Sequence, residues 1–460
     1  MYTIRMIRKY KIKLTAWQYL SLGYFIVIFI GTALLCLPFA TKNGESTTFI
    51  NALFTSTSAT CVTGLVPYDT NTHWTTFGQI VIMLLIQTGG LGFMTLVTLI
   101  FLAFGKNLGL RQRKILMLSA GEEKPSDLKR LFRRLLIGTF VFEGVGAMLL
   151  SVRFIGDFGV GKGIYYAIWH SVSAFCNAGF DLMGGVLGQG QFVSFTYYAT
   201  DPLVSLTLAA LIIVGGLGFC VWDDVLIAKG NAKKFCLHTK IVLAVTTILL
   251  ILSTLLYLLF DYNNAYYADY TFGEKLLISF FNATTPRTAG FNTVDFSKLS
   301  DSSYLLTLIL MFIGGSSAST AGGVKITTFV VIVMGMFAVF RNKSDIEIGR
   351  RRVSGALLRQ SLAIFVSCLF IVTTATIAIC AIEAANPQAT LQAVLFETVS
   401  AMGTVGLSLS LTPTLSVTSK IILIILMYAG RVGILTIGLT FGEKKELAEV
   451  KKPIENILIG

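Results

Sequence analysis

Long apolar runs alternate with short polar segments along most of the chain. Eight of these runs have the roughly twenty residues that an α-helix needs to cross the hydrocarbon core of a bilayer. They lie near residues 17–38, 79–104, 129–152, 203–228, 239–261, 303–340, 356–384 and 416–441. The run from 303 is too long for one straight helix, and a Gly/Ser tract interrupts it. The pattern predicts an all-α integral membrane protein with eight spanning helices.

A second pattern recurs between the two runs of each successive pair. Four stretches of seventeen residues have the form of a short helix followed by a glycine: FINALFTSTSATCVTGL, IYYAIWHSVSAFCNAGF, KLLISFFNATTPRTAGF and LQAVLFETVSAMGTVGL. Their glycines, Gly64, Gly179, Gly290 and Gly406, are separated by 115, 111 and 116 residues. Non-helical backbone at membrane depth is tolerated only where it is buried in protein or lines a watery path. The sequence therefore predicts four re-entrant segments that form four walls of one pore.

These two patterns combine into four repeats, each a spanning helix, a short pore helix, a glycine-bearing stretch and a second spanning helix. Two crossings per repeat return the chain to the same side, so we expect all four repeats to be parallel around a pseudo-fourfold axis. Inverted-repeat transporters instead bind their substrate at an interface in the membrane plane. The predicted boundaries are a terminal segment 1–16, repeats 17–115, 116–230, 231–345 and 346–442, and a tail 443–460.

The distribution of basic residues predicts which side of the membrane each connecting segment faces. Only 13% of residues are charged, against about 25% in soluble proteins, and the net charge is +13. Of the 37 Lys and Arg residues, 29 lie before residue 17, after 442, or in the segments that join one repeat to the next. By the positive-inside rule, these segments and both termini face the cytoplasm. Topology and contact with lipid headgroups explain the basic charge better than nucleic acid binding does.

Each glycine-bearing stretch has the composition that a cation filter requires. Such filters use main-chain carbonyls in place of a hydration shell, and glycine permits the unusual backbone conformation. The end of each short helix would also direct its partial negative charge at the ion path. We expect the carbonyls of four residues per repeat to contribute: Cys61, Val62, Thr63 and Gly64; Cys176, Asn177, Ala178 and Gly179; Arg287, Thr288, Ala289 and Gly290; Gly403, Thr404, Val405 and Gly406. Asp69, Asp181 and Asp295 come soon after the glycines of the first three stretches. At a pore mouth they would attract cations. The alternative is that they are ordinary solvated loop carboxylates.

The tract GGSSASTAGGVK at 314–325 predicts a flexible loop inside the pore, because glycine and serine weaken a helix interior. Its members are Gly314, Gly315, Ser316, Ser317, Ala318, Ser319, Thr320, Ala321, Gly322, Gly323 and Lys325. A local kink is the plainer interpretation. Arg431 stands in the last apolar run, where a charge is costly and must find partners. It is interpreted either as a barrier below the filter that holds this loop, or as a structural partner of Glu143 or Glu397.

The segments SATCVTGL, FCNAGF, PRTAGFNTVD and SAMGTVGLS, together with the Gly/Ser tract, resemble the Trk/Ktr/HKT superfamily of potassium transporters over residues 17 to 441. The segment before the first run is only sixteen residues long, and in this respect the chain resembles the Ktr branch of the superfamily. The resemblance implies a bacterial plasma membrane, a homodimer with one pore per protomer, and a cytosolic nucleotide-binding ring of the KtrA type. It also implies that the 314–325 tract is an intramembrane gate. Glycine at all four filter positions favours K⁺, and sodium coupling stays open.

Other functions find less support in the residues. The seven cysteines contain no CxxC, the three histidines share no metal-ligand spacing, and no nucleophile–base motif of a hydrolase occurs. We therefore expect no enzyme activity, and no cofactor or metal in this chain beyond K⁺ at the filter. A secondary transporter of another cation, with broken helices, is the main alternative. It would be favoured by intramembrane carboxylates, of which the chain has few.

Overall fold

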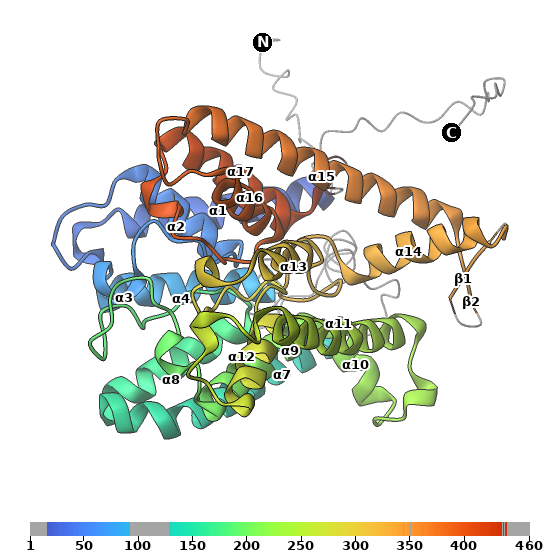
Figure 1. The fold of residues 1–460 in the computed structure, drawn as a ribbon, viewed down its shortest axis with the longest axis horizontal. Helices are drawn as coiled ribbons and strands as arrows, with labels where there is room; N and C mark the ends of the chain where they lie inside the picture. Colours follow the sequence, from blue (N-terminus) through green and yellow to red (C-terminus); the bar gives the residue numbers. More distant parts are fainter. Residues whose placement is uncertain are drawn as a thin grey trace, which may run out of the picture.

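The computed structural model describes residues 16–92, 128–343, 345–348, 351–434, 436 and 438. Their regular secondary structure is almost entirely helical, and Figure 1 colours the chain in order from blue to red. Twelve helices form four groups of three, each with a short middle helix. The groups are α1 (Ala16–Leu35), α2 (Phe49–Thr60) and α4 (Thr76–Leu91); α7 (Leu128–Phe158), α8 (Val160–Phe175) and α9 (Pro202–Leu217); α11 (Leu237–Asp261), α12 (Phe272–Thr284) and α13 (Asp301–Phe312); and α15 (Gly355–Ile382), α16 (Leu391–Gly403) and α17 (Val417–Val432).

The four groups contact one another in a closed cycle. Within each group, the first helix packs against the other two. Between groups, the third helix of one packs against the short helix of the next: α4 on α8, α9 on α12, and α13 on α16. The last such contact, α17 on α2, joins the end of the chain to its beginning. The middle and third helices of successive groups therefore alternate around the cycle.

Three of the third helices end at a glycine with a positive φ angle. Gly92 follows α4 with φ +82°, Gly218 follows α9 with φ +95°, and Gly433 follows α17 with φ +91°. Glycine has no Cβ and adopts this conformation at little cost, so these positions can stop a helix inside an apolar run. At Gly218 the chain continues into α10 (Phe219–Ile227) with a bend of 87°. The predicted run 203–228 therefore consists of two helices joined by a bend.

The third helix of group three is interrupted in a different way. After α13 the chain is non-helical until α14 (Ile326–Phe340) begins. The Gly/Ser tract lies in this gap, so the predicted run 303–340 is divided as its composition indicates. Ile313 and Val324 form an isolated parallel bridge that closes the base of the loop.

By length and apolar composition, three described helices are able to cross a membrane: Arg133–Phe158 within α7, α11 and α15. The bent pair α9 and α10 makes a fourth if it counts as one span. The sequence predicts eight spans, and the difference arises mainly because the third helices are broken or end early. The predicted runs 79–104 and 416–441 also continue beyond the described residues.

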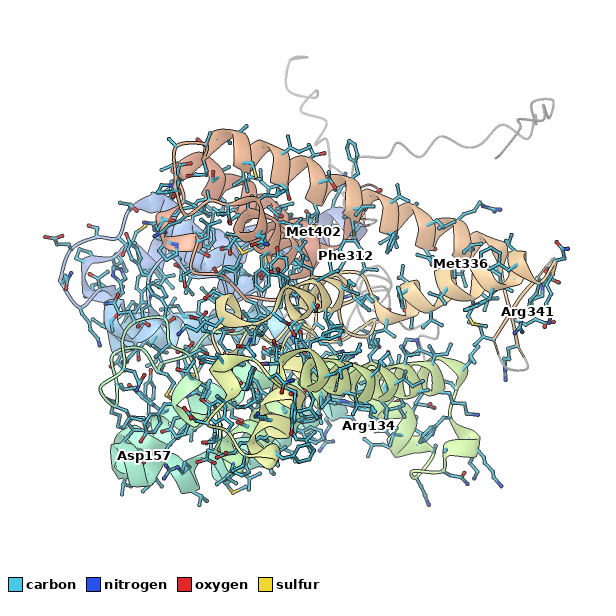
Figure 2. All side chains as sticks on the ribbon, in the orientation of Figure 1. Arg134, Asp157, Phe312, Met336, Arg341 and Met402 are labelled. Carbon is cyan, nitrogen blue, oxygen red and sulfur yellow. The ribbon has the colours of Figure 1, made fainter. Side chains whose placement is uncertain are left out.

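The remaining elements are short: α3 (Thr70–His73), 3₁₀ turns at Pro38–Ala40, Thr196–Tyr198, Ala232–Lys234, Ala265–Tyr267, Phe296–Lys298 and Thr412–Thr414, and strands β1 (Ile346–Ile348) and β2 (Arg351–Val353). The strands form an antiparallel hairpin in which Ile346 faces Val353, within a segment that the sequence predicted only as a basic connection. The hairpin lies where α14 and α15 project from one end of the molecule (Figure 1). Arg341 lies at this end and Asp157 at the opposite one (Figure 2).

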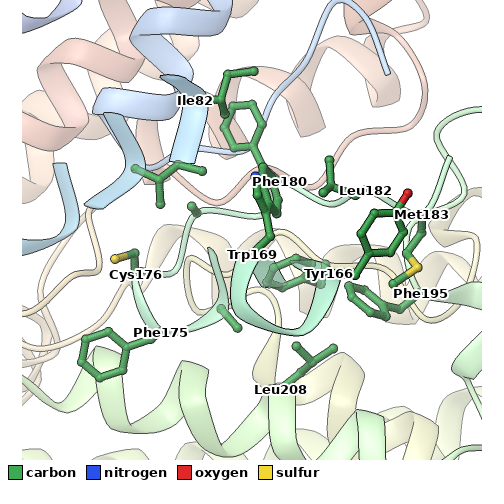
Figure 3. Packing of buried hydrophobic residues seen from close by; sticks show 14 of the residues in the cluster. Ile82, Tyr166, Trp169, Phe175, Cys176, Phe180, Leu182, Met183, Phe195 and Leu208 are labelled. Atoms are coloured by element: carbon green, nitrogen blue, oxygen red, sulfur yellow. The ribbon is translucent and has the colours of Figure 1, made fainter. Parts of the chain in front are cut away.

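The largest buried cluster joins groups one and two. Trp169 of α8 is fully buried, and its Nε1 donates a hydrogen bond to the Gln79 carbonyl of α4 at 3.2 Å. Phe180 and Ile82 belong to the same cluster (Figure 3). Phe180 directly follows the glycine of the second stretch, so this packing holds that stretch against its neighbour.

Candidate functional site

The end of each short helix is tied to the glycine-bearing stretch by a hydroxyl group. In group one, the Gly64 N–H donates to Ser58 Oγ at 3.1 Å. In group four, the Gly406 N–H donates to Ser400 Oγ at 3.0 Å. Both hydroxyls are buried and come six positions before the glycine, so each stretch folds back over the end of its own helix.

In groups two and three the hydroxyl is also from Ser or Thr, but it donates a hydrogen bond instead of accepting one. Ser173 Oγ donates to the Phe180 carbonyl at 2.7 Å, and Thr285 Oγ1 donates to the Phe291 carbonyl at 2.7 Å. We call Ser58, Ser173, Thr285 and Ser400 the clamp hydroxyls. In group three the spacing to the glycine is five residues rather than six. The glycine pattern alone does not identify them, although a Ser or Thr at nearly constant spacing is a usable signal.

The four glycines have the same backbone conformation and contact one another. Their φ angles are +95°, +71°, +79° and +91° for Gly64, Gly179, Gly290 and Gly406. A Cβ added at Gly64 would meet the Ala178 carbonyl oxygen at 2.6 Å, and one at Gly179 would meet that of Ala289 at 2.8 Å.

The same relation continues around the cycle. A Cβ at Gly290 would meet the Val405 carbonyl oxygen at 2.5 Å, and one at Gly406 would overlap that of Thr63. Each glycine thus faces the carbonyl that precedes the glycine of the next group. We call this closed arrangement the glycine ring. No other residue has room at these positions, since even a methyl group would displace a neighbouring main chain.

Two residues before each glycine, a non-glycine residue also has a left-handed φ. The angles are +56°, +57°, +71° and +51° for Val62, Asn177, Thr288 and Thr404. This conformation is a real outlier for β-branched residues and costs about 1–3 kcal/mol at each position. Four independent segments with the same strained pattern indicate that the strain serves the site. Alternating left-handed residues turn successive carbonyls in the same direction.

The predicted residues therefore meet at one place, although their side chains have different surroundings. Cys61, Cys176 and Arg287 are buried three positions before their glycines. Cys176 Sγ lies 3.6 Å from Gln87 Oε1, and Arg287 donates to Thr246 Oγ1 at 3.2 Å. These side chains belong to the wall behind the ring, and the main chain faces its centre.

A cavity lies on the side of the ring that the chain enters after each glycine. All four ring glycines line it, as do Asp69 and Asp181, and its volume is about 90 Å³. We call it the ring cavity. Asp295 does not line it; this carboxylate is exposed and accepts the Ser297 N–H at 3.0 Å. Two of the three predicted mouth carboxylates are therefore at the site, and the third is a solvated loop residue.

The two cavity carboxylates are held by main-chain N–H groups. Asp69 accepts from the N–H groups of Thr72 and Phe192, each at 2.9 Å, and so joins two loops that are far apart in sequence. Asp181 accepts from the Met183 N–H at 2.9 Å. Burial, with a further contribution from the nearby Asp69 charge, raises the pKa of Asp181 to about 7. The cavity thus holds negative charge that changes near neutral pH.

The 314–325 loop lies against the other side of the ring residues. A Cβ at Gly323 would lie 3.2 Å from the Gly403 Cα, and one at Gly322 would overlap Thr404. The loop is also bonded to the break after α9: the Ser316 N–H donates to the Gly216 carbonyl at 3.0 Å. Gly218 there has little room, because a Cβ would meet the Ser317 carbonyl oxygen at 2.8 Å.

Arg431 joins this loop to group one. Its guanidinium donates to the main-chain carbonyls of Thr320 and Gly89, and to that of Gly90 at 3.4 Å. The alternative in which it pairs with Glu143 or Glu397 is therefore wrong for this structure. Lys325 Nζ donates to the Ala321 carbonyl at 2.7 Å. Two cationic side chains thus hold loop carbonyls just beyond the ring.

Glycines in the third helices allow them to approach the ends of the short helices. A Cβ at Gly89, Gly215 or Gly430 would overlap the carbonyl oxygen of Thr60, Phe175 or Met402, respectively. These three carbonyls each come four residues before a ring glycine. These glycines permit close helix packing, which fixes the ring against the helices around it.

Among the described residues, no group of three or more His, Cys, Asp or Glu side chains is arranged to hold a metal ion. The histidines lie in packed or hydrogen-bonded positions; His170, for example, is fully buried in α8. The donors gathered at the ring are neutral carbonyl oxygens with carboxylates nearby. Such a set suits a monovalent cation that is held by main-chain dipoles.

Comparison with known proteins agrees with this chemistry. The family model described as "TrkH: Cation transport protein" matches residues 15–450. The chain is 41% identical to the potassium/sodium uptake protein NtpJ of Enterococcus hirae, over 97% of this chain and 98% of that protein. It is 39% identical to the Ktr system potassium uptake protein B of Bacillus subtilis, over 98% of each.

Its fold is similar to that of the potassium transporter TrkH from Vibrio parahaemolyticus, seen in a crystal structure. The TM-score is 0.69, with 17% identity over 95% of this chain and 87% of that one. At this identity the likeness concerns the fold alone. The family match covers nearly the whole chain, and we conclude that this multi-pass membrane protein belongs to the TrkH family of cation transport proteins.

Proposed function

We propose that this chain is the pore-forming membrane subunit of a potassium uptake system, and that the glycine ring is its selectivity filter. The observation that carries the proposal is the cyclic contact of four equivalent glycines, each facing the preceding carbonyl of the next group. Carbonyls arranged in this way replace the hydration shell of a cation. Of two relatives of nearly equal length, one is named as a potassium uptake protein and the other as a potassium/sodium uptake protein, which supports K⁺ as the ion.

The four groups are four parallel repeats around one axis along the membrane normal. The ring cavity is the outer mouth, where Asp69 and Asp181 raise the local concentration of cations. The opposite end, with Arg341 and the β hairpin (Figure 2), faces the cytoplasm in accordance with the positive-inside rule. Both termini lie on that side of a bacterial plasma membrane.

The 314–325 loop is the gate of this pore. Its support is its position directly beyond the ring, together with the hydrogen bonds that Arg431 makes to the Thr320 and Gly89 carbonyls. Opening requires the loop to leave these partners. A cytosolic ring of KtrA type, which binds the regulatory nucleotide, supplies the driving force. The chain acts as a homodimer with one pore per protomer, and Na⁺ either activates transport or is coupled to it.

The proposal is tested in cells that lack their own potassium uptake systems. We expect the wild-type chain, expressed with a cytosolic ring subunit, to restore growth at low K⁺ and to take up ⁸⁶Rb⁺. Purified protein in K⁺-loaded vesicles should conduct K⁺ in preference to Na⁺. A properly inserted protein that moves neither ion, with or without the ring subunit, contradicts the proposal.

A further inference from the structure

Each short helix carries several buried polar residues, and one of them recurs at a fixed position, three residues before the clamp hydroxyl. The four residues are Thr55, His170, Asn282 and Glu397, and none is more than 1% exposed. Apolar residues are expected on a helix that is buried on all sides. The recurrence of a polar side chain at this position is not explained by helix formation, because it adds nothing to helix propensity.

Two of these residues reach across to the segment that follows the ring. His170 Nε2 accepts the N–H of Leu182 at 2.9 Å, and the Glu397 carboxyl accepts a hydrogen bond from the Thr412 hydroxyl. The other two bond elsewhere. Thr55 Oγ1 donates to the Asn51 carbonyl of its own helix, and Asn282 donates to the Tyr267 hydroxyl. Only groups two and four, which are diagonal in the cycle, have this second connection.

The connection in group four spans a segment with little main-chain hydrogen bonding. Ser400 fixes the stretch at Gly406, and Glu397 fixes it again at Thr412. Between these two points, residues 407–411 donate no main-chain hydrogen bond to any other described residue. Ser408, Ser410 and Thr412 line the ring cavity. Leu407 and Leu411 anchor this wall by burial, and the Thr412–Glu397 contact adds a hydrogen bond on its polar side.

Beyond Thr412, the Glu397 carboxyl has the Ser408 side chain as a neighbour. Its Oε2 atom is buried without a hydrogen-bond partner among the described residues. Among the same residues, no Lys or Arg forms a salt bridge with Glu397. Burying such a group is costly. A residue that served packing alone would be replaced by leucine or glutamine at a gain in stability.

We propose that Glu397 is a positioning residue for ion selection: through Thr412 it fixes the 407–412 wall of the ring cavity and thereby the alignment of the fourth stretch. The inference rests on the proposed function, since it assigns Glu397 a part in the discrimination between K⁺ and Na⁺. Loss of the contact allows the outer end of one filter wall to move. The carbonyls of this wall then fit the larger, less hydrated K⁺ less selectively.

The test compares three variants with the wild type in K⁺/Na⁺ competition flux, normalised to folded protein. Glu397→Leu removes the acceptor, while Glu397→Gln keeps an acceptor oxygen and should restore selectivity. Thr55→Val is the matched control, because it removes an equally buried hydroxyl that bonds only within its own helix. We expect Glu397→Leu to lower the preference for K⁺ about tenfold, as for the loss of one hydrogen bond to a charged group. The other two variants should stay near wild type.

Amide hydrogen exchange over residues 407–414 gives a readout that does not depend on transport. Glu397→Leu and Thr412→Val should both accelerate exchange there, and their double variant should add nothing further. Unchanged exchange in Glu397→Leu overturns the positioning role. Faster exchange with unchanged selectivity overturns the role in ion selection. A wild-type protein that transports no cation refutes the proposed function instead, and the exchange result still decides the anchoring.

Discussion

Arg431 donates a hydrogen bond to the main-chain carbonyl of Thr320, 111 residues earlier in the chain, and its second bond goes to the Gly89 carbonyl. One cationic side chain thus bridges the 314–325 loop and the end of α4. Neither acceptor is charged, so the positive charge of Arg431 is solvated by main-chain dipoles and not neutralised. A cation that passes the glycine ring must come close to it.

The first prediction concerns this charge. A unit charge 4 Å from a permeating ion costs about 4 kcal/mol at an effective dielectric of 20, and a third of that value changes a rate about tenfold. Arg431→Gln should therefore raise K⁺ flux per folded protein about tenfold. Arg431→Lys, which keeps the charge, should stay closer to wild type. If the glutamine variant conducts no faster in vesicles, Arg431 is a structural bridge only.

The second prediction concerns the glycine ring. Gly290→Ser places a Cβ 2.5 Å from the Val405 carbonyl oxygen in a left-handed backbone. It should lower K⁺ uptake or the preference over Na⁺ by about tenfold, since strain of this kind costs about 1–3 kcal/mol. Gly188→Ser is the control: its φ is +71°, yet a Cβ there meets nothing within 4 Å. Equal effects in competition assays would show that backbone strain, not the ring contact, is responsible.

The third prediction concerns the contacts that keep the 314–325 loop in its place below the ring. Deletion of residues 316–321 should raise basal flux and weaken its dependence on a cytosolic regulator. Gly218→Ala is a smaller change, because its Cβ would press on the Ser317 carbonyl. If Gly218→Ala lowers the barrier to ion passage at the loop by about 1.4 kcal/mol, basal uptake becomes tenfold faster.

Gly433→Ala provides the comparison for this loop experiment. It carries the same left-handed strain, but the nearest atom to its Cβ is 3.7 Å away. Basal ⁸⁶Rb⁺ uptake without the regulator should rise for Gly218→Ala and not for Gly433→Ala. Wild-type uptake and regulation in a folded deletion variant would show that the loop is merely a kink.

The fourth prediction is a pH dependence from the outer side. Asp181 lies in the loop after Phe180, and burial together with Asp69 raises its pKa to about 7. Above that pH the carboxyl is ionised and attracts cations; below it the carboxyl is protonated and neutral. Uptake at limiting K⁺ should therefore fall as the external pH drops from about 8 to about 6. The fall should be at most about fivefold, the effect of one charge at 4 Å in water.

Two asparagine variants test the assignment of this pH effect. Asp181→Asn should give low, nearly pH-independent uptake over the same range. Asp295→Asn should keep the wild-type profile, because this carboxylate is exposed and does not line the ring cavity. A wild-type profile that survives in Asp181→Asn assigns the titration to another group.

Much of this architecture can be predicted from the spacing of the glycine-bearing stretches along the sequence. The recurrence of Gly64, Gly179, Gly290 and Gly406 located the ring, because glycine is the residue type that tolerates both a positive φ and a neighbouring carbonyl. The break at Gly218 was not predicted, because the three glycines of this apolar run, Gly215, Gly216 and Gly218, are also compatible with close packing of a continuous helix. The left-handed conformation of Val62 and Thr404 was equally hidden: local preference disfavours it, and only contacts between groups impose it.

The partners of Arg431 were hidden for another reason. A main-chain carbonyl is present at every residue, so no side-chain type in the sequence marks Gly89 or Thr320 as an acceptor. The two available carboxylates, Glu143 and Glu397, were the natural candidates. Freed carbonyls at a broken helix and in a non-helical loop solvate a guanidinium instead.

The closure of the cycle by α17 on α2 has a consequence for biosynthesis. Gly406 is made some 340 residues after Gly64, which at ~5–20 residues per second is roughly 20–70 s of translation. Throughout this time α2 lacks the neighbour that will cover it, and the Thr63 carbonyl lacks the glycine that will face it. The ring therefore cannot be completed before Gly406 has been made. A ribosome-stalled chain that ends before Gly406 should be integrated yet remain an open arc, unable to hold an ion at its centre.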